Sequence, residues 1–433
     1  MNSKIKVVDK KSLVPFILIT SLFALWGFAN DITNPMVAAF QTIMEISTFK
    51  ASLVQFAFYG GYATMAIPAA LFIMKFSYKK GILLGLALYA IGSLLFWPAA
   101  QYQVFAFFLV SLYILTFGLA FLETTANPFV LSLGAKETAT QRLNLAQAFN
   151  PLGSLLGMFV ASKFILAALV SDKQRNAAGE LIFSTLDEAT KASIRTNDLI
   201  IIRNPYVALG LIVLIMLIAI AIVKIPQSAQ DNKTHPIESI KRLIRNRNYR
   251  EGVLAQIFYV AAQIMCWTFI IQYADNLGIV KTTAQNYNIA AMGIFLISRF
   301  ISTFLMKYIN ARKLLMMFAI GGMTTITGTI FIEGMTGLYC LMATSAFMSL
   351  MFPTIYGIAL HDVGDDVSLG SAGLVMAIVG GALMPPIQGA IIDLGTLGFL
   401  PAVNASFILP FISFCVIAMY GYRSYKSQLK IDK

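Results

Sequence analysis

Charged residues are scarce in this sequence. Only 12% of the 433 residues are Asp, Glu, Lys or Arg, whereas 58% are hydrophobic. Because a soluble globular domain carries about 25% charged residues, this composition excludes an ordinary soluble protein. Apolar runs of about 18 residues or more, each long enough to cross a lipid bilayer, recur along almost the whole chain. The composition therefore predicts an all-α, polytopic membrane protein.

Cysteine and histidine are also scarce, which limits the possible chemistry. The three cysteines, Cys266, Cys340 and Cys415, lie singly in apolar segments, without the paired spacing of a disulfide framework or a metal site. The two histidines, His235 and His361, lie in or beside loops and outside any HExxH or GxSxG motif. No phosphate-binding loop of the form GxxxxGK(S/T) occurs either. The sequence thus predicts no metal, no cofactor and no enzyme, and it favours a carrier driven by an ion gradient.

The apolar runs divide into twelve predicted spans when each run is ended at charges and turn residues. We expect these spans near residues 13–39, 51–75, 80–98, 102–131, 143–169, 203–224, 252–275, 284–306, 313–333, 337–360, 369–392 and 400–422. A polar, basic stretch separates the sixth span from the seventh. We therefore predict two six-helix domains, residues 1–224 and 251–433, joined by a linker at residues 225–250.

The linker contains a short helical pattern. Ile237, Ile240, Leu243 and Ile244 recur at helical spacing among basic residues. This pattern is typical of an amphipathic helix that lies on a membrane surface. We expect the helix on the cytoplasmic lipid surface.

The basic residues of the loops predict the orientation. They are concentrated at both termini, in the linker, and in the turns after the second, fourth and eighth spans, which all lie on one side of a twelve-span protein. The long loop after the fifth span, on the other side, has a balanced charge. Since cytoplasmic loops are enriched in Lys and Arg, we expect both termini in the cytoplasm and the chain in the inner membrane. Contact with anionic lipid, rather than with nucleic acid, then explains the net charge of +12.

The two halves carry similar short patterns. Trp26 precedes Asp31 in the first span, and Trp267 precedes Asp275 in the seventh. The turn MKFSYKK after the second span is similar to MKYINARK after the eighth. Matches at corresponding spans favour two parallel six-helix repeats around a central cavity, the architecture of a large class of secondary carriers.

Two acidic residues lie inside predicted spans. Glu123 lies well within the fourth span and Asp31 lies in the first, just before Pro35. A carboxyl group in lipid is costly, so such residues usually face a cavity and serve ion transport. Glu123 is the main candidate for proton coupling and Asp31 is the second. The alternatives are a structural carboxylate paired with a buried Arg for Glu123, and a solvated residue at the helix end for Asp31.

Side-chain amides recur inside the spans, and each offers both hydrogen-bond donors and an acceptor. Such groups suit a neutral ligand rich in hydroxyls, although hydrogen bonding between helices is an alternative use of each. Trp26 and Trp267 could stack on the apolar face of a sugar ring or pack inside the bundle. The candidate substrate-binding residues are Asn30, Asn34, Asn127, Gln147, Asn150, Gln256, Gln263, Trp26 and Trp267.

Two basic residues lie more than one helical turn from the nearest loop, Lys163 in the fifth span and Arg299 in the eighth. Long basic side chains in such positions commonly extend to the membrane surface, and we expect this of both. If Arg299 instead faces the cavity, it could bind an anionic substrate or pair with an acid.

At these residues the sequence resembles the fucose permease family of the major facilitator superfamily. The matching stretches are FALWGFAND, FLETTANPFV, RLNLAQAFNPLGS, LAQIFYVAAQIMCW and AFMSLMFPTIY, which follow in order along most of the chain. The resemblance implies import of sugars such as fucose, glucose, galactose or mannose, mostly by proton symport through alternating access of two six-helix domains. It matches Glu123 to the family's acid in the fourth span, which is linked to proton and sugar coupling. It matches Gln147 and Asn150 to amides that line the family's cavity.

The first span departs from this resemblance. The fucose-specific members carry Asn at the position of Asp31 and Asp at the position of Asn34, so the acid here has moved by about one helical turn. The acidic residue that the superfamily usually has in the turn after the second span is also absent. The sequence therefore leaves open which sugar is carried and how many protons accompany it.

Together these observations predict a monomeric secondary transporter that imports a neutral monosaccharide with a proton. Its expected partners are the sugar, the proton and membrane lipid, and not nucleic acid. Sodium coupling, or an anionic substrate bound by Arg299, is the alternative.

Overall fold

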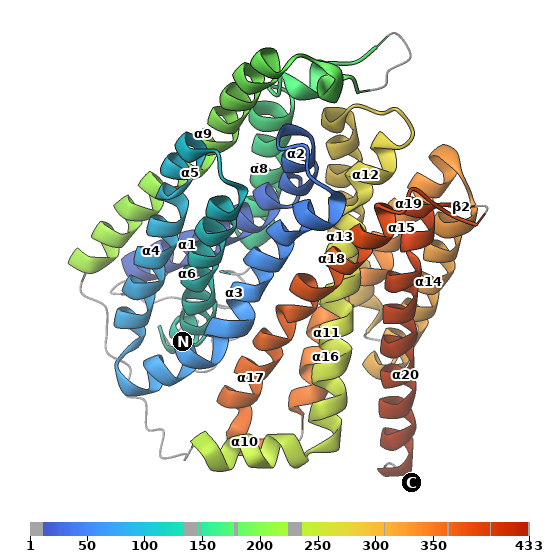
Figure 1. The fold of residues 1–433 in the computed structure, drawn as a ribbon. Coiled ribbons are helices and arrows are strands. Elements are labelled where there is room, and N and C mark those ends of the chain that lie inside the picture. Colours follow the sequence, from blue (N-terminus) through green and yellow to red (C-terminus); the bar gives the residue numbers. More distant parts are fainter. Residues whose placement is uncertain are drawn as a thin grey trace, which may run out of the picture.

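The computed structural model describes residues 12–133, 146, 149–176, 181–223, 236–306, 308–361, 363–398 and 400–431. Nearly all of these residues are helical, which confirms the all-α prediction. Figure 1 shows the long helices running side by side between two ends of the molecule, with helix α10 (Pro236–Arg245) lying across one of them. We call this end the α10 end.

Each predicted span is one helix or a series of two or three consecutive helical elements. In the first half the spans are α1 (Leu13–Thr33) with α2 (Met36–Ile43), α3 (Thr48–Lys75), α4 (Tyr78–Leu94) with α5 (Phe96–Tyr102), α6 (Phe105–Ser132), α8 (Phe149–Val160) with the π-helix η3 (Ala161–Leu166), and α9 (Glu188–Ile222). In the second half they are α11 (Arg247–Thr268) with α12 (Ile270–Asp275), α13 (Lys281–Leu305), α14 (Ala311–Phe331), α15 (Gly334–Met348) with α16 (Met351–Leu360), α17 (Val367–Met376) with η7 (Ala377–Val379) and α18 (Gly380–Ile392), and α19 (Ala402–Ser406) with α20 (Ile408–Ile431). Short 3-10 turns η4 (Ser171–Lys173), η5 (Phe183–Thr185) and η6 (Gly364–Asp366) lie in connections, and β1 (Thr396–Leu397) pairs antiparallel with β2 (Leu400–Pro401) before α19.

Within the described ranges, eleven helical segments are long and apolar enough to cross a membrane. The predicted eighth span is α13, which is not among them although its 25 residues are long enough. Polar residues of α13, Gln285, Asn288 and Arg299 among them, lower its hydropathy. With α13 the segments make the twelve predicted spans.

The sixth span begins earlier than expected. Helix α9 begins at Glu188 rather than near residue 203, and the Asp187 side chain accepts a hydrogen bond from the Thr190 backbone N–H at 3.0 Å. This capping bond satisfies one of the free N–H groups of the first turn. The polar first turns of α9 were assigned to the loop because they are not apolar, yet they continue the same helix.

The first and seventh spans are each broken at one place. Span 1 breaks between α1 and α2 at Asn34 and Pro35, and span 7 breaks between α11 and α12 at Phe269. Proline has no N–H to donate to the preceding turn, so the predicted bend at Pro35 is confirmed. The corresponding breaks fit the predicted relation between the two halves.

Glycines allow neighbouring spans of the first half to approach closely. A Cβ atom on Gly153 of α8 would overlap the Ala24 carbonyl oxygen of α1, and one on Gly27 of α1 would overlap the Asn150 carbonyl oxygen. Small residues at such contacts let helix backbones touch, which is a main source of association in membranes. Helices α1 and α8 are thereby fixed against each other beside the centre of the molecule.

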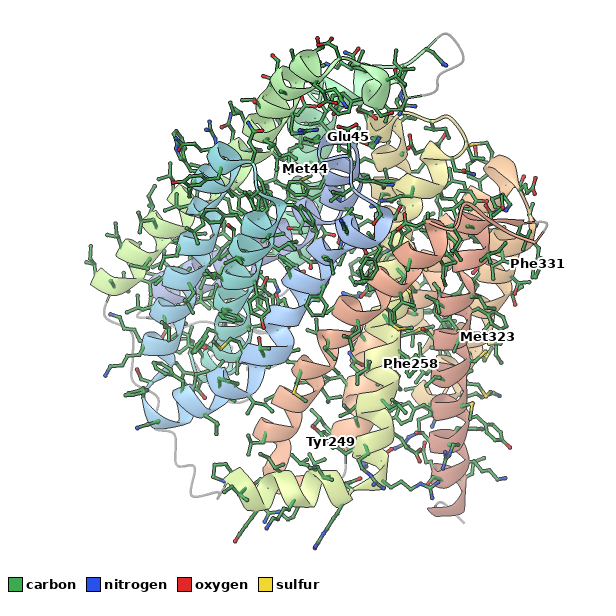
Figure 2. All side chains as sticks on the ribbon, viewed as in Figure 1. Met44, Glu45, Tyr249, Phe258, Met323 and Phe331 are labelled. Carbon is green, nitrogen blue, oxygen red and sulfur yellow. The ribbon has the colours of Figure 1, made fainter. Side chains whose placement is uncertain are left out.

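The predicted amphipathic helix is α10, and one face of it packs on the second half. Leu243 is buried in a small apolar cluster with Tyr249 and Leu374, and Arg242 forms an ion pair with Asp366 at 2.7 Å. The Tyr249 hydroxyl donates to the Gly370 carbonyl at 2.9 Å, just beyond α10 in Figure 2. The opposite face of α10 is exposed, as an amphipathic helix requires.

The two halves meet along α3, which packs against α17 and α18, and along α13, which contacts α8 and η3. Figure 1 shows α3 lying beside α17 and α18 in the middle of the molecule. Helix α3 therefore makes the more extensive of these two contacts between the halves.

Candidate functional site

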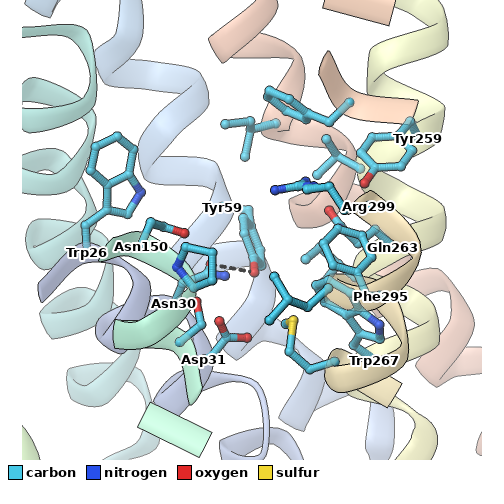
Figure 3. A pocket seen from close by; sticks show the side chains of 18 of the residues that line it. Trp26, Asn30, Asp31, Tyr59, Asn150, Tyr259, Gln263, Trp267, Phe295 and Arg299 are labelled. Carbon is cyan, nitrogen blue, oxygen red and sulfur yellow. Dashed lines mark hydrogen bonds between the residues drawn. The ribbon is translucent and has the colours of Figure 1, made fainter. Parts of the chain in front are cut away.

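A cavity of about 220 Å³ lies between the two halves. Helices α1, α3, α6 and α8 line it from the first half, and α11, α13, α16 and η7 line it from the second. The polar and aromatic side chains of its wall are Trp26, Asn30, Asp31, Tyr59, Tyr62, Glu123, Asn150, Ser154, Tyr259, Gln263, Trp267, Phe295, Arg299 and Phe352. Figure 3 shows most of them directed toward a common space.

Asp31 lies in the wall of this cavity near the end of α1. It is only 1% exposed, and its Oδ1 accepts a hydrogen bond from Asn34 Nδ2 at 3.0 Å. Next to it, the Tyr59 hydroxyl donates to Asn30 Oδ1 at 2.9 Å (Figure 3). Ser154 of α8 also lies within hydrogen-bonding reach of Asp31. The structure therefore does not support the alternative of a solvated residue at the helix end.

Glu123 lines the same cavity from α6. Tyr62 of α3 lies beside it in the wall. A carboxyl group in this place can bind a proton or accept a hydrogen bond from a ligand hydroxyl. The two acids predicted from the sequence are thus brought to one cavity by two different helices.

Two further side chains of the first half, Trp26 and Asn150, are held by the α1 and α8 contact. The Trp26 ring stacks on Phe23 with 5.1 Å between ring centroids. The Asn150 amide donates to the Phe23 carbonyl at 3.3 Å, which leaves its carbonyl oxygen available to a ligand. Both side chains border the cavity, as Figure 3 shows.

The second half contributes an aromatic wall and one cation. Trp267 donates from Nε1 to Ser345 Oγ at 3.2 Å, and its ring meets Phe295 edge to face with 5.1 Å between centroids. Arg299 donates from Nε to the Ser349 carbonyl at 3.2 Å, and its guanidinium lies 4.8 Å from the Phe295 ring centroid. The Arg299 side chain therefore belongs to the cavity wall, and the expectation that it extends to the membrane surface is not supported. Lys163, by contrast, is exposed.

Not every predicted residue lines the cavity. Asn34 is buried behind Asp31, where its Oδ1 accepts a hydrogen bond from Gln55 at 3.2 Å. Gln256 is fully buried one turn from Tyr259, and neither of its amide atoms has a partner among the described residues. Gln147 and the side chain of Asn127 lie outside the described residues. The remaining candidates, Trp26, Asn30, Asn150, Gln263 and Trp267, do border the cavity.

The sequence analysis missed the tyrosines of this wall. Tyr59 and Tyr62 of α3, and Tyr259 of α11, line the cavity. Tyr259 is completely buried, and its hydroxyl has no partner among the described residues. Their signal in the sequence was a hydroxyl within a span, with Tyr59 and Tyr62 three residues apart and so on one helix face.

Ion pairs join the two halves at the end opposite α10. Asp172 of η4 lies 2.7 Å from Lys281 Nζ of α13, and Arg175 lies 3.0 Å from Asp275 of α12. Burial opposes ionisation of Asp172, but Lys281 and Arg175 outweigh this effect and hold its pKa below the ordinary value of 3.8. The cavity is therefore closed off at this end by paired charges.

A second contact of this kind involves a helix terminus. The Asp393 carboxylate, at the end of α18, accepts hydrogen bonds from the backbone N–H groups of Thr48 at 2.7 Å and of Phe49 at 2.8 Å. These are free N–H groups at the start of α3, where the helix dipole favours a negative charge. Nearby, but within the first half, Glu45 pairs with Arg195 at 2.8 Å (Figure 2).

Comparisons with known proteins now decide the family. The sequence profile described as "Major Facilitator Superfamily" matches residues 17–382. The chain belongs to the major facilitator superfamily. The predicted twelve-helix transporter architecture is thereby confirmed, as is the prediction that the chain is a transporter and not an enzyme.

Relatives within this superfamily match over nearly their whole length. The L-fucose-proton symporter of Haemophilus influenzae is 65% identical, with 98% of this chain and 99% of that protein covered. The L-fucose-proton symporter of Escherichia coli is 35% identical, and the glucose/galactose transporter of Brucella abortus is 33% identical. These matches cover 96% of this chain and 95% of the former relative, and 94% of this chain and 93% of the latter. They confirm the resemblance to the fucose permease family.

A solved structure of this superfamily has the same fold. The crystal structure of the transporter FucP in the outward conformation superposes with a TM-score of 0.70 at 34% identity, with 96% of this chain and 99% of that chain covered. The carbonyl, carboxylate and aromatic groups of the cavity therefore lie within the architecture of a secondary carrier, between the two halves whose relative movement such carriers use.

Proposed function

We propose that this chain imports L-fucose, or a closely similar neutral monosaccharide, together with a proton by alternating access. The observation that carries this proposal is the composition of one cavity between the halves. Two carboxyl groups, Asp31 and Glu123, share it with amides and with two tryptophans. Ionisable groups inside membrane-spanning helices are costly, and they usually belong to the pathway of an ion or a substrate.

The wall of the cavity suits a sugar. Carboxylates and amides accept hydrogen bonds from hydroxyls, amides also donate, and the Tyr259 hydroxyl is available from the second half. Trp26 and Trp267 border the cavity from opposite halves, so an apolar sugar face can lie against a ring. A ligand that contacts both halves at once can stabilise one arrangement of the halves relative to the other.

The relatives favour L-fucose among the sugars. The 65% identical relative, aligned over almost the whole of both chains, is named as an L-fucose-proton symporter, and the transporters named for glucose and galactose are about half as similar. Their names also support proton coupling over sodium coupling. In this chain the coupling role falls to Glu123 first and to Asp31 second.

An anionic substrate is less well supported. Arg299 is the cation of the cavity wall among the described residues, and two carboxyl groups share that wall with it. The Arg299 guanidinium is already engaged by the Ser349 carbonyl and the Phe295 ring. A negatively charged ligand would therefore meet more repulsion than attraction in this cavity.

We propose that the α10 end faces the cytoplasm of the cell and that the ion pairs of Asp172 and Arg175 close the opposite, outer end. The basic loops support this orientation, and the two predicted domains, residues 1–224 and 251–433, would then move against each other. Because the whole cavity lies within one chain, we propose that the monomer transports.

Cysteine labelling of intact cells tests the orientation, in a background without the three native cysteines. Ala189→Cys, in the first turn of α9, should react from outside, and Lys241→Cys of α10 only after permeabilisation; the reverse would refute the orientation.

Uptake by the purified chain in proteoliposomes tests the function. Labelled L-fucose should accumulate when a pH gradient, acidic outside, is imposed, and not when a sodium gradient is imposed at equal pH. Unlabelled D-glucose, D-galactose and D-mannose, added as competitors, should rank below L-fucose. Accumulation driven by sodium would refute proton coupling, and efficient competition only by an acidic sugar would refute the neutral substrate.

A further inference from the structure

A chain of buried hydrogen bonds runs from Asp31 in the cavity to the second half of the molecule. Asn34 Nδ2 donates to Asp31 Oδ1 at 3.0 Å. Gln55 Nε2, on α3, donates both to Asn34 Oδ1 at 3.2 Å and to Thr268 Oγ1 at 2.9 Å. Each of these four side chains is at most 1% exposed. Gln55 is therefore the single link in this chain between the first half and the second.

The two residues that Gln55 joins, Asn34 and Thr268, lie at places where a span is broken. Asn34 lies between α1 and α2, just before Pro35, and Thr268 is the last residue of α11 before α12 begins. The segments beyond these breaks, α2 and α12, lie toward the end where the ion pairs close the two halves. A contact between the two breaks is therefore well placed to hold that end shut.

We propose that Gln55 is a positioning residue that transmits the hydrogen-bonding state of Asp31 to the contact between the two halves. This inference rests on the proposed function, in which Asp31 takes part in binding the proton or the sugar. Gln55 touches neither the cavity nor its ligand, so it acts only through its neighbours.

The direction of the hydrogen bonds gives the mechanism. An ionised carboxylate can only accept, so Asp31 fixes Asn34 with its amide nitrogen toward Asp31 and its oxygen toward Gln55. Gln55 must then present its nitrogen, which also reaches Thr268, while its own Oε1 has no partner among the described residues. The charge on Asp31 thus sets the orientation of two amides in turn.

Protonation of Asp31 permits the reverse order, because the carboxyl group can then also donate. The new O–H donates to the Asn34 oxygen, the Asn34 nitrogen turns toward Gln55, and Gln55 turns its oxygen toward both neighbours. No other group gains or loses a proton. Thr268 must then donate rather than accept, and the Gln55 amide nitrogen takes the place of Oε1, which has no hydrogen-bond partner among the described residues. The buried N–H groups of Gln55 are left unsatisfied there, which costs free energy. The contact between the halves is therefore weaker when Asp31 is protonated.

Other groups face Asp31 from the helices packed against it. Tyr59 of α3, Ser154 of α8 and the neighbouring Asn30 are neutral. The charged groups of the same cavity are Glu123 of α6 and Arg299 of α13. None of the five is joined to Thr268 by a hydrogen bond of the described residues. They can shift the pH at which Asp31 titrates, but the link to the second half runs through Gln55.

The test measures how readily the outer end opens in the absence of sugar. Ala38→Cys, in a background without the native cysteines, places a thiol on α2 where the two halves meet; Ala38 is 3% exposed and lines a crevice with Ile271 and Gln272 of α12. In proteoliposomes, the rate of its reaction with an impermeant maleimide reports opening. This rate is divided by the rate for an exposed control thiol at the same pH, which removes the pH dependence of the maleimide reaction itself. The corrected rate should rise as the pH is lowered from 8 to 5.

Removal of the link should remove this pH dependence. Gln55→Leu should react about threefold to tenfold faster at pH 8, the effect of one lost buried hydrogen bond, and should change little with pH. Thr268→Val, from the other half, should behave alike, and the double variant should add little to either single change. The matched control is Thr33→Val, which loses a buried bond to Tyr206 at 2.9 Å within the first half. It should keep the full pH dependence.

The outcomes separate this inference from the proposed function. An unchanged pH dependence in folded Gln55→Leu and Thr268→Val, or equal loss in Thr33→Val, would overturn the link. A pH-dependent rate in Asp31→Asn would overturn the role of Asp31 in it. Because the assay contains no sugar, a failure to accumulate L-fucose would refute the proposed substrate and leave this result standing.

Discussion

Lys281 and Asp172 form an ion pair between the two halves, with 2.7 Å between Nζ and Oδ1 and with both side chains nearly buried. Removing one member of such a pair leaves a charge in a poorly hydrated place, which costs about 3 to 5 kcal/mol. The pair joins the two halves at the end opposite α10, so the cost falls on the arrangement in which that end is closed.

Lys281→Met should therefore slow sugar uptake at least about tenfold while L-fucose binding from outside is retained, because the closed arrangement becomes rare. Initial uptake rates and equilibrium binding on the same proteoliposomes check this. The matched control is Lys191→Met, whose ion pair with Glu45 lies within the first half, and it should leave the uptake rate within about twofold. Equal loss in both variants would show that the effect is general destabilisation.

Asp172 also gives a prediction for pH. Its pKa is held below 3.8 in the folded protein by Lys281 and Arg175, against the effect of burial. A carboxyl group with a lowered pKa contributes stability that is complete above about pH 4 and is lost as the pH falls through the folded value. The difference in thermal unfolding temperature between wild type and Asp172→Asn should be constant from pH 8 to about 5 and shrink below about pH 4. A difference that changes between pH 8 and 6 would contradict this.

The sequence predicted the spans well because a helix that crosses a membrane needs a long run of apolar residues. It failed where a helix is not apolar. The first turns of α9, from Glu188, are polar, and α13 carries Gln285, Asn288 and Arg299. The first turns of α9 are largely exposed, whereas Gln285 and Asn288 are buried in protein and Arg299 borders the cavity. A hydropathy average cannot separate these surroundings.

The candidate site was predicted in part for a similar reason. Ionisable and amide side chains stand out in an apolar span, so Asp31, Glu123 and Asn150 were found. Which face of a helix turns to the cavity depends on tertiary packing, so the sequence could not tell that Asn34 lies behind Asp31. For the same reason the sequence could not tell that Tyr259 borders the cavity while Gln256, on the same helix, does not.

Glu123→Gln should abolish accumulation of L-fucose driven by a pH gradient, because a permanently neutral side chain cannot release a proton during the cycle. Counterflow exchange of labelled for unlabelled sugar needs no net proton movement and should survive. Both are measured in the same proteoliposomes. Normal accumulation by this variant would exclude Glu123 from proton coupling, whereas loss of counterflow as well would point to a role in binding the sugar.

Gly153 should be essential for the contact of α8 with α1. A methyl group there would overlap the Ala24 carbonyl oxygen, and such overpacking costs about 1 to 3 kcal/mol. Gly153→Ala should therefore lower the thermal unfolding temperature of the purified protein. Gly357→Ala on α16 is the matched control, since a Cβ there meets nothing within 4 Å. A similar melting temperature for both variants would contradict the close contact.

The last prediction concerns the acid of the first span. Asp31 borders the cavity, whereas Asn34 lies behind it and receives a hydrogen bond from Gln55. Asp31→Asn alone leaves the first span without an acidic residue and should impair accumulation. The exchange of the two residues, Asp31→Asn with Asn34→Asp, should restore part of it, because Gln55 Nε2 can donate to a carboxylate at position 34, and such charge-assisted bonds are the stronger ones.

The exchange should also change the preference among sugars. An amide at position 31 meets a sugar hydroxyl as donor or acceptor, whereas the native carboxylate only accepts. Competition of L-fucose uptake by D-galactose and D-glucose, compared between the wild type and the double variant, measures this preference. By the family resemblance, the double variant has the order of amide and acid that the fucose-specific members carry in the first span, so its preference for L-fucose should not fall. Full accumulation and an unchanged sugar profile in Asp31→Asn alone would show that the acid of the first span takes no part in transport.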